Sequence, residues 1–217
     1  MQTMLLVQRE TMGFRKMSRL IAFGDSFTFG HYLPDCDEQP SMLAWPQLLG
    51  DKLGLEVVNQ SSPGASNNEI LFTILNFKFQ PTDLVVVGWT FVHRDLLYKK
   101  SFFGKLFNKD EHRRVSIHDN DDISKKWQEV HTDYDRRIRT GLLIEHADLY
   151  LRSLNLRHYH FFALDFFNLK PIWTHKPVTW INETIIKYKD FALDNKHPGI
   201  KTHSLAADTL YRIINET

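Results

Sequence analysis

The sequence of 217 residues contains only one cysteine, Cys36. A single thiol cannot form an internal disulfide, and a chain of this length can bury a core that is stable without one. We therefore expect the protein to work in the cytoplasm or in another reducing compartment.

Long apolar runs are lacking as well. No stretch approaches the ~20 apolar residues that a membrane-spanning helix requires, and charged side chains such as Arg9 and Lys16 interrupt the N-terminal segment. We expect neither a membrane span nor a signal peptide. Methionines at positions 1, 4, 12 and 17 precede the first predicted strand. Residues 1–16 are therefore expected to be a leader or a disordered extension, and residues 17–217 a single domain.

The chain has no excess of charge of either sign, because 27 Lys and Arg side chains stand against 26 Asp and Glu, a formal net charge of +1. Proteins that bind nucleic acids take much of their affinity from basic side chains that neutralise phosphates. The balanced charge therefore argues against a nucleic-acid partner.

Strand and helix patterns alternate along most of the chain. Short apolar runs predict buried strands, over residues 19–23, 56–59, 83–88 and 158–164. Apolar residues at helical spacing predict helices, over residues 41–53, 68–79, 133–154 and 202–214. Such alternation is typical of an α/β fold, a three-layer α/β/α sandwich in which a mainly parallel sheet lies between two layers of helices.

Two segments depart from this alternation. Residues 91–130 are charged and aromatic without a clear period, and we interpret them as an insertion. Their basic side chains and phenylalanines are suited to a single-stranded polymer or to a lid, and we favour a substrate-covering or partner-contacting insert. Residues 165–196 contain two prolines and are predicted to be mostly loop, with a short helix over residues 182–188.

A serine follows the first predicted strand, in the segment Phe23-Gly24-Asp25-Ser26. Sites in open parallel sheets are built at the carboxyl ends of the strands. A serine in a tight turn before a helix can expose its hydroxyl, and its own N–H can point at a developing oxyanion. The Gly-Asp-Ser triplet is also an ordinary turn or N-cap pattern, so by itself it identifies no site.

A second polar group precedes the last predicted helix, in Asp194-Asn195-Lys196-His197-Pro198. An aspartate three residues before a histidine can orient the imidazole, which leaves the other ring nitrogen to accept a proton from a serine. The alternative is a loop with a solvated histidine. The order along the chain, with each group at the edge of the predicted sheet, favours the catalytic interpretation.

These segments resemble the SGNH, or GDSL-type, hydrolases. The first block of that family is matched by residues 21–30 and the last by Asp194-x-x-His197-Pro198, with His203 where the family often has a second histidine. Residues 59–68 resemble the second block, whose glycine is Gly64 here. The blocks span about residues 19 to 210, and their combination is more specific than any one motif.

The resemblance implies a flavodoxin-like α/β/α sandwich and the hydrolysis of a small-molecule or carbohydrate ester without metal or cofactor. Ser26 is then the nucleophile, His197 the base and Asp194 its orienter, while the N–H groups of Ser26 and Gly64 receive the oxyanion. Asp25 is interpreted as a turn residue that bonds local backbone.

The third block departs from the family pattern. The family usually has Gly-x-Asn-Asp after the third strand, but this sequence has Gly88-Trp89-Thr90-Phe91 and no asparagine. Three side chains are candidates to replace that oxyanion donor, namely Asn67, Thr90 and Arg94. The altered block also leaves a second function open, that of a non-catalytic binding or assembly protein which retains the fold. The joint presence of the first and last blocks favours the enzyme.

Two possible metal sites are weaker. His158 and His160 alternate along a predicted strand and share a face, but an aromatic strand face explains them better because no nearby carboxylate completes a ligand set. Asp119, Asp121 and Asp122 lack the glycine and glutamate of a calcium loop, so a turn and helix N-cap is expected there. We expect no metal.

Overall fold

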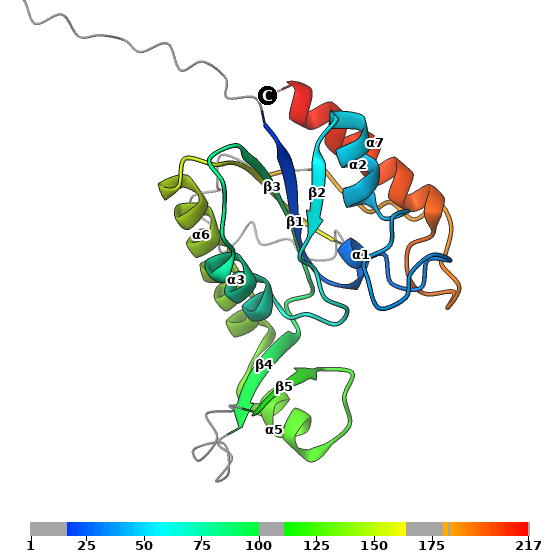
Figure 1. Cartoon of the computed structure of the whole chain (residues 1–217). Helices are drawn as coiled ribbons and strands as arrows, with labels where there is room; N and C mark the ends of the chain where they lie inside the picture. Colours follow the sequence, from blue (N-terminus) through cyan, green and yellow to red (C-terminus); the bar gives the residue numbers. More distant parts are fainter. Residues whose placement is uncertain (1–16, 100–110, 164–179, 182, 217) are drawn as a thin grey trace, which may run out of the picture.

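The computed structural model describes residues 17–99, 111–163, 180–181 and 183–216 (Figure 1). The leader expected over residues 1–16 lies outside these ranges. At the centre is a four-stranded parallel sheet in the order β2-β1-β3-β6. Its strands are β1 (Arg19–Phe23), β2 (Glu56–Asn59), β3 (Asp83–Trp89) and β6 (Arg157–Phe162).

The alternation of side chains along the strands places apolar residues on both faces of the sheet. In β1, Leu20 and Ala22 belong to one core cluster, whereas Ile21 and Phe23 belong to the other. All seven residues of β3 are buried, which explains its uninterrupted apolar run.

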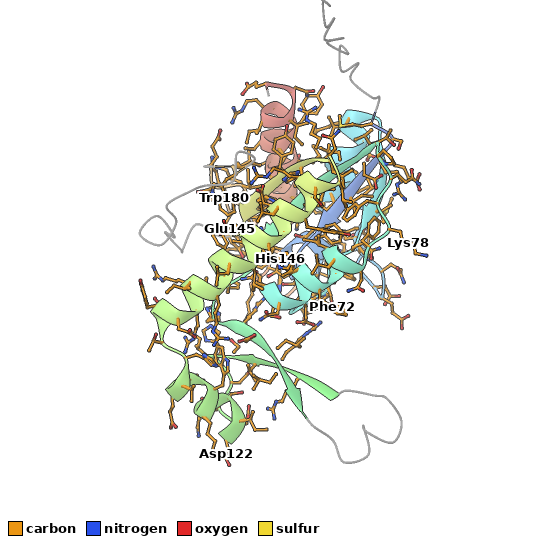
Figure 2. The ribbon with its side chains drawn as sticks, turned by 90° about the vertical axis from the view of Figure 1, so that its left-hand side faces the viewer. Phe72, Lys78, Asp122, Glu145, His146 and Trp180 are labelled. Atoms are coloured by element: carbon orange, nitrogen blue, oxygen red, sulfur yellow. The ribbon has the colours of Figure 1, made fainter. Side chains whose placement is uncertain are left out.

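One layer of helices covers each face (Figure 1). Helix α2 (Trp45–Leu53) packs against α7 (Ile200–Glu216) on one face, and α3 (Asn67–Asn76) packs against α6 (Asp133–Ser153) on the other. Figure 2 shows the second face, with α3 and α6 in front of the sheet. The predicted three-layer α/β/α sandwich is confirmed.

Helix α2 begins later than its apolar spacing predicts, at Trp45 rather than at residue 41. Pro46 is the second residue of the helix, in the first turn, where its fixed φ favours helix initiation. Helix α3 begins with a capping box, in which Ser66 and Glu69 satisfy each other's backbone N–H groups.

The described part of residues 91–130 forms a separate unit after β3. Strands β4 (Arg94–Lys99) and β5 (Glu111–Ser116) pair antiparallel in a two-stranded sheet, and α5 (Asp122–Val130) follows. This hairpin lies beyond the carboxyl ends of the parallel strands (Figure 1). Asp121 caps α5 by accepting from the N–H groups of Ile123 and Ser124, which is the N-cap expected for that acidic turn.

The short helix predicted over residues 182–188 is wrong for residues 183–188, which form bends and irregular chain. Ile185 and Ile186 are buried in the core on the α2–α7 side, so tertiary packing rather than helical periodicity explains these apolar residues. In the described ranges, no helix is both long enough and apolar enough to cross a membrane.

Candidate active site

The site lies at the carboxyl end of β1, where the chain turns into the short helix α1 (Ser26–Phe29). Asp25 is the N-cap of this helix, and its carboxylate accepts from the Phe27 N–H at 3.0 Å. Gly30 ends the helix with a φ of 76°, a left-handed conformation that glycine adopts without strain. Because α1 is capped at both ends, the Ser26 backbone is held in a fixed turn.

The structure brings Ser26, His197 and Asp194 together across the sheet edge. The His197 Nε2 atom lies 3.1 Å from Ser26 Oγ, and His197 Nδ1 lies 2.6 Å from Asp194 Oδ2. Both distances fall in the hydrogen-bonding range of a nucleophile, a base and its orienter.

Local hydrogen bonds fix the Asp194 carboxylate. Its Oδ1 atom accepts from the backbone N–H groups of Lys196 and His197, each at 3.0 Å. Burial alone would raise the pKa of Asp194, but the hydrogen bonds from the His197 backbone and ring and from Lys196 outweigh it and lower this pKa to about 2. Asp194 therefore stays ionised beside the imidazole over the whole neutral range.

A second aspartate holds the loop that carries His197. The Asp190 carboxylate accepts from the N–H groups of Lys201 and Thr202, and its carbonyl accepts from Gly199 N–H. A Cβ atom at Gly199 would lie 2.5 Å from Asp190 Cγ, so only glycine allows this close approach. The sequence pattern did not reveal Asp190, whose carboxylate partners are backbone N–H groups and the Thr202 hydroxyl.

Aromatic rings surround the imidazole of His197. Phe27 and His31 make edge-to-face contacts with it at 5.6 and 5.5 Å between centroids, and Tyr32 lies at 5.1 Å. Burial, followed by the nearby His197, lowers the pKa of His31. His203 is not part of this group, because its Nδ1 atom accepts from Trp45 N–H on the α2 side.

The loop after β2 lies against the turn that carries Ser26. Ser62 N–H donates to Gly24 O at 3.2 Å, and the Asn59 side chain donates to Thr28 O at 2.9 Å. Gly64 follows with a φ of 74°. Among the described residues, no hydrogen bond engages the backbone N–H of Ser26 or that of Gly64.

Asn67, Thr90 and Arg94, the three candidates to replace the missing asparagine, form one hydrogen-bonded group with Asp25. Thr90 donates its hydroxyl to Asp25 Oδ2 at 2.5 Å, and Arg94 donates to the same oxygen at 2.8 Å. The Asn67 amide bonds both backbone groups of Thr90. Asp25 was interpreted as a residue that bonds local backbone; the structure shows that it also receives two side chains from beyond β3.

A cavity of about 210 Å³ opens beside this group, between α3, α6 and the start of β4. Polar or charged side chains such as Asn67, Arg94 and Asp95 line it together with the apolar Val92, Leu142 and Leu143, and more apolar than polar surface faces the cavity.

The histidines of β6 have a carboxylate partner that the sequence did not reveal. Asp148 on α6 lies 3.0 Å from His158 Nε2 and 3.8 Å from His160 Nε2. However, Trp89 Nε1 donates to His160 Nδ1, which places the neutral ring's proton on Nε2 and leaves no lone pair there for a metal. The three residues form a polar network in the core.

Solved structures match this chain, although no protein-family model and no curated protein does. A carbohydrate esterase, described as having an active site with divergent catalytic and non-catalytic binding functions, has a TM-score of 0.57 at 14% identity, over 94% of this chain and 70% of that one. A protein of the G-D-S-L family from Desulfitobacterium hafniense has a TM-score of 0.52 at 13% identity, over 90% and 99%. A catalytic mutant of an acetylxylan esterase from Geobacillus stearothermophilus has a TM-score of 0.51 at 14% identity, over 92% and 95%.

These matches cover nearly the whole described domain. The chain shares its fold with these solved esterases and with the G-D-S-L family protein, and this fold agrees with the one that the order of the sequence blocks implies.

Proposed function

We propose that this protein is a serine ester hydrolase with Ser26 as its nucleophile. The observation that carries the proposal is the pair of contacts at His197, 3.1 Å to Ser26 Oγ and 2.6 Å to Asp194 Oδ2. A solvated histidine in a surface loop would not be held between a buried serine and an ionised aspartate.

In this mechanism Ser26 Oγ attacks the ester carbonyl carbon while His197 Nε2 takes the hydroxyl proton. Asp194 stabilises the resulting imidazolium through Nδ1. His197 then protonates the departing alkoxide, which leaves an acyl-enzyme at Ser26. Water attacks the acyl carbon with His197 again as base, and the carboxylic acid is released with the Ser26 hydroxyl restored.

The N–H groups of Ser26 and Gly64 receive the negative oxygen of each tetrahedral intermediate. Thr90 cannot be a further donor, because its one hydroxyl proton is already donated to Asp25. Asn67 and Arg94 each keep hydrogens beyond those that they donate to Thr90 and Asp25, so either can serve as the third donor.

The substrate that we propose is a short acyl ester of a small molecule or a carbohydrate. The likeness to solved structures of a carbohydrate esterase and of an acetylxylan esterase supports this substrate class. The half-exposed ring of Tyr32 beside His197 offers an apolar face to such a substrate.

The test is reaction with a fluorophosphonate probe followed by peptide mapping, which reports an activated serine without knowledge of the substrate. We expect labelling on Ser26 alone and none in Ser26→Ala or His197→Ala. Absence of labelling in the folded wild-type protein would overturn the proposal.

A non-catalytic binding protein is the second candidate, and the absence of an asparagine after β3 favours it. Such a protein would bind an acetylated oligosaccharide equally well with and without the Ser26 hydroxyl and would release no acetate. Acetate release that disappears in Ser26→Ala excludes it.

A further inference from the structure

One arginine of the β4–β5 hairpin contacts the loop that carries Gly64. Arg114, on β5, donates from Nη1 to Pro63 O at 2.6 Å and from Nη2 to Ser62 Oγ at 3.1 Å. Its Nε atom donates to Glu69 Oε1 at 2.9 Å. A single guanidinium therefore links the hairpin to three residues around Gly64.

The contact with Pro63 matters because of the planarity of the peptide bond. The carbonyl of Pro63 and the N–H of Gly64 belong to the same peptide unit, whose atoms lie in one plane. Whatever fixes the direction of that carbonyl therefore also fixes the direction of the Gly64 N–H. A hydrogen bond from a charged donor to the carbonyl, moreover, polarises the peptide and strengthens the N–H as a donor.

The guanidinium is itself held in place. Glu69 belongs to the capping box of α3, where its Oε2 atom accepts from Ser66 N–H at 2.9 Å, so its position is set by the start of the helix. A Cβ atom at Gly64 would lie 3.4 Å from Arg114 Nη1, which places the guanidinium directly against this glycine.

We propose that Arg114 is a positioning residue which aims the Gly64 N–H at the substrate oxyanion. The hairpin inserted after β3 then completes the oxyanion site from outside the parallel sheet, in a chain that lacks the family asparagine. This inference rests on the proposed esterase function and adds to it the role of the insertion.

The competing explanation is an ordinary surface ion pair between Arg114 and Glu69, which would contribute little to stability or activity. The chain offers a matched control in Arg113, the neighbouring residue on β5. The Arg114 side chain is 45% exposed and that of Arg113 is 46% exposed. Arg113, however, pairs at 2.7 Å with Asp121 inside the insertion and not with the loop that carries Gly64.

The kinetic experiment compares Arg114→Ala, Arg114→Lys and Arg113→Ala on the acetyl ester of p-nitrophenol. Because the Gly64 N–H acts on the developing oxyanion, we expect Arg114→Ala to lower kcat by roughly 10- to 100-fold with little change in KM. Lysine can reach one oxygen but cannot reproduce the three-way contact, so Arg114→Lys should recover part of the loss. Arg113→Ala should match the wild type.

Hydrogen exchange tests the same role without any substrate. The N–H groups of Ser62 and Ala65 donate to Gly24 O and Ser62 O, so their exchange reports the order of the loop. We expect faster exchange of both amides in Arg114→Ala than in Arg113→Ala, at unchanged melting temperature.

Equal exchange and equal kcat in the two alanine variants would overturn the role of Arg114. If wild-type Ser26 is not labelled by fluorophosphonate, the esterase proposal fails, and the oxyanion role of Arg114 fails with it. If Ser26 is labelled but Arg114→Ala changes neither amide exchange nor kcat, the esterase proposal holds and only the proposed role of Arg114 fails.

Discussion

The carboxylate of Asp25, which is fully buried immediately before Ser26, accepts a hydrogen bond from Arg94 Nη1 at 2.8 Å across 69 positions of the chain. Arg94 is the first residue of β4, so this ion pair joins the inserted hairpin to the turn that carries Ser26. Its guanidinium carbon also lies 4.8 Å from the centre of the Phe91 ring.

Arg94→Ala should destabilise the protein, because it leaves a buried carboxylate without its cation. Loss of one partner of a fully buried pair costs about 3 to 5 kcal/mol. The Arg94 side chain is 24% exposed, so water offsets part of the loss and we expect about 1 to 3 kcal/mol. Urea unfolding at neutral pH measures this change. A free energy of unfolding within about 0.5 kcal/mol of wild type would contradict it.

Asp194→Asn should lower kcat by roughly 10⁴-fold while the fold is retained, because the amide no longer stabilises the imidazolium or its productive tautomer. Steady-state kinetics and the rate of fluorophosphonate labelling should fall together. Asp208→Asn is the control, since Asp208 lies on α7 in an exposed pair with Lys52. Activity of Asp194→Asn close to that of the control would remove Asp194 from the mechanism.

The sequence predicted those parts of the molecule that depend on residues close together in the chain. Short apolar runs such as residues 19–23 identified the strands, and the spacing between Asp194 and His197 identified a carboxylate that can reach the imidazole. The partners of Asp25 and of the Gly64 loop were harder to identify. Arg114 and Glu69 are 45 positions apart, and Arg114 lies in a segment without hydrophobic period.

Acyl-chain preference is the next prediction. We expect an acetyl ester to be hydrolysed faster than the decanoyl ester of the same chromophore, because a methylene gains rate only where an apolar pocket receives it. Neither Ser26 nor His197 lines the cavity beside Arg94, so that cavity gives a long acyl chain no apolar surface next to the reacting carbonyl. The polar side chains of the second block are largely engaged in the fold, since Ser66 caps α3 and Asn67 holds Thr90. Faster turnover of the decanoyl ester would contradict this prediction.

Buried histidines should make the protein less stable in mild acid. Burial is the main cause that lowers the pKa of His93 and His203 to about 4 and that of His160 to about 3. In the unfolded chain a histidine has a pKa of about 6.5. Between about pH 6.5 and pH 4 the unfolded state therefore binds protons that the folded state does not, so the free energy of unfolding falls as the pH falls.

Inside this window each such histidine lowers the free energy of unfolding by up to about 1.4 kcal/mol for each unit by which the pH falls. Above the window it has no effect on the pH dependence. Urea unfolding at about pH 7, 6 and 5 should show the loss, and His203→Asn should reduce the slope by about one histidine's share. Asparagine is chosen because its side-chain oxygen can accept from Trp45 N–H, as His203 Nδ1 does. His146→Asn is the control, since it makes the same substitution at a histidine that is exposed on α6 (Figure 2). Because the comparison is between slopes, a constant packing loss in His203→Asn does not affect it. An unaltered slope in that variant would mean that His203 is protonated in the folded state at the same pH as in the unfolded one.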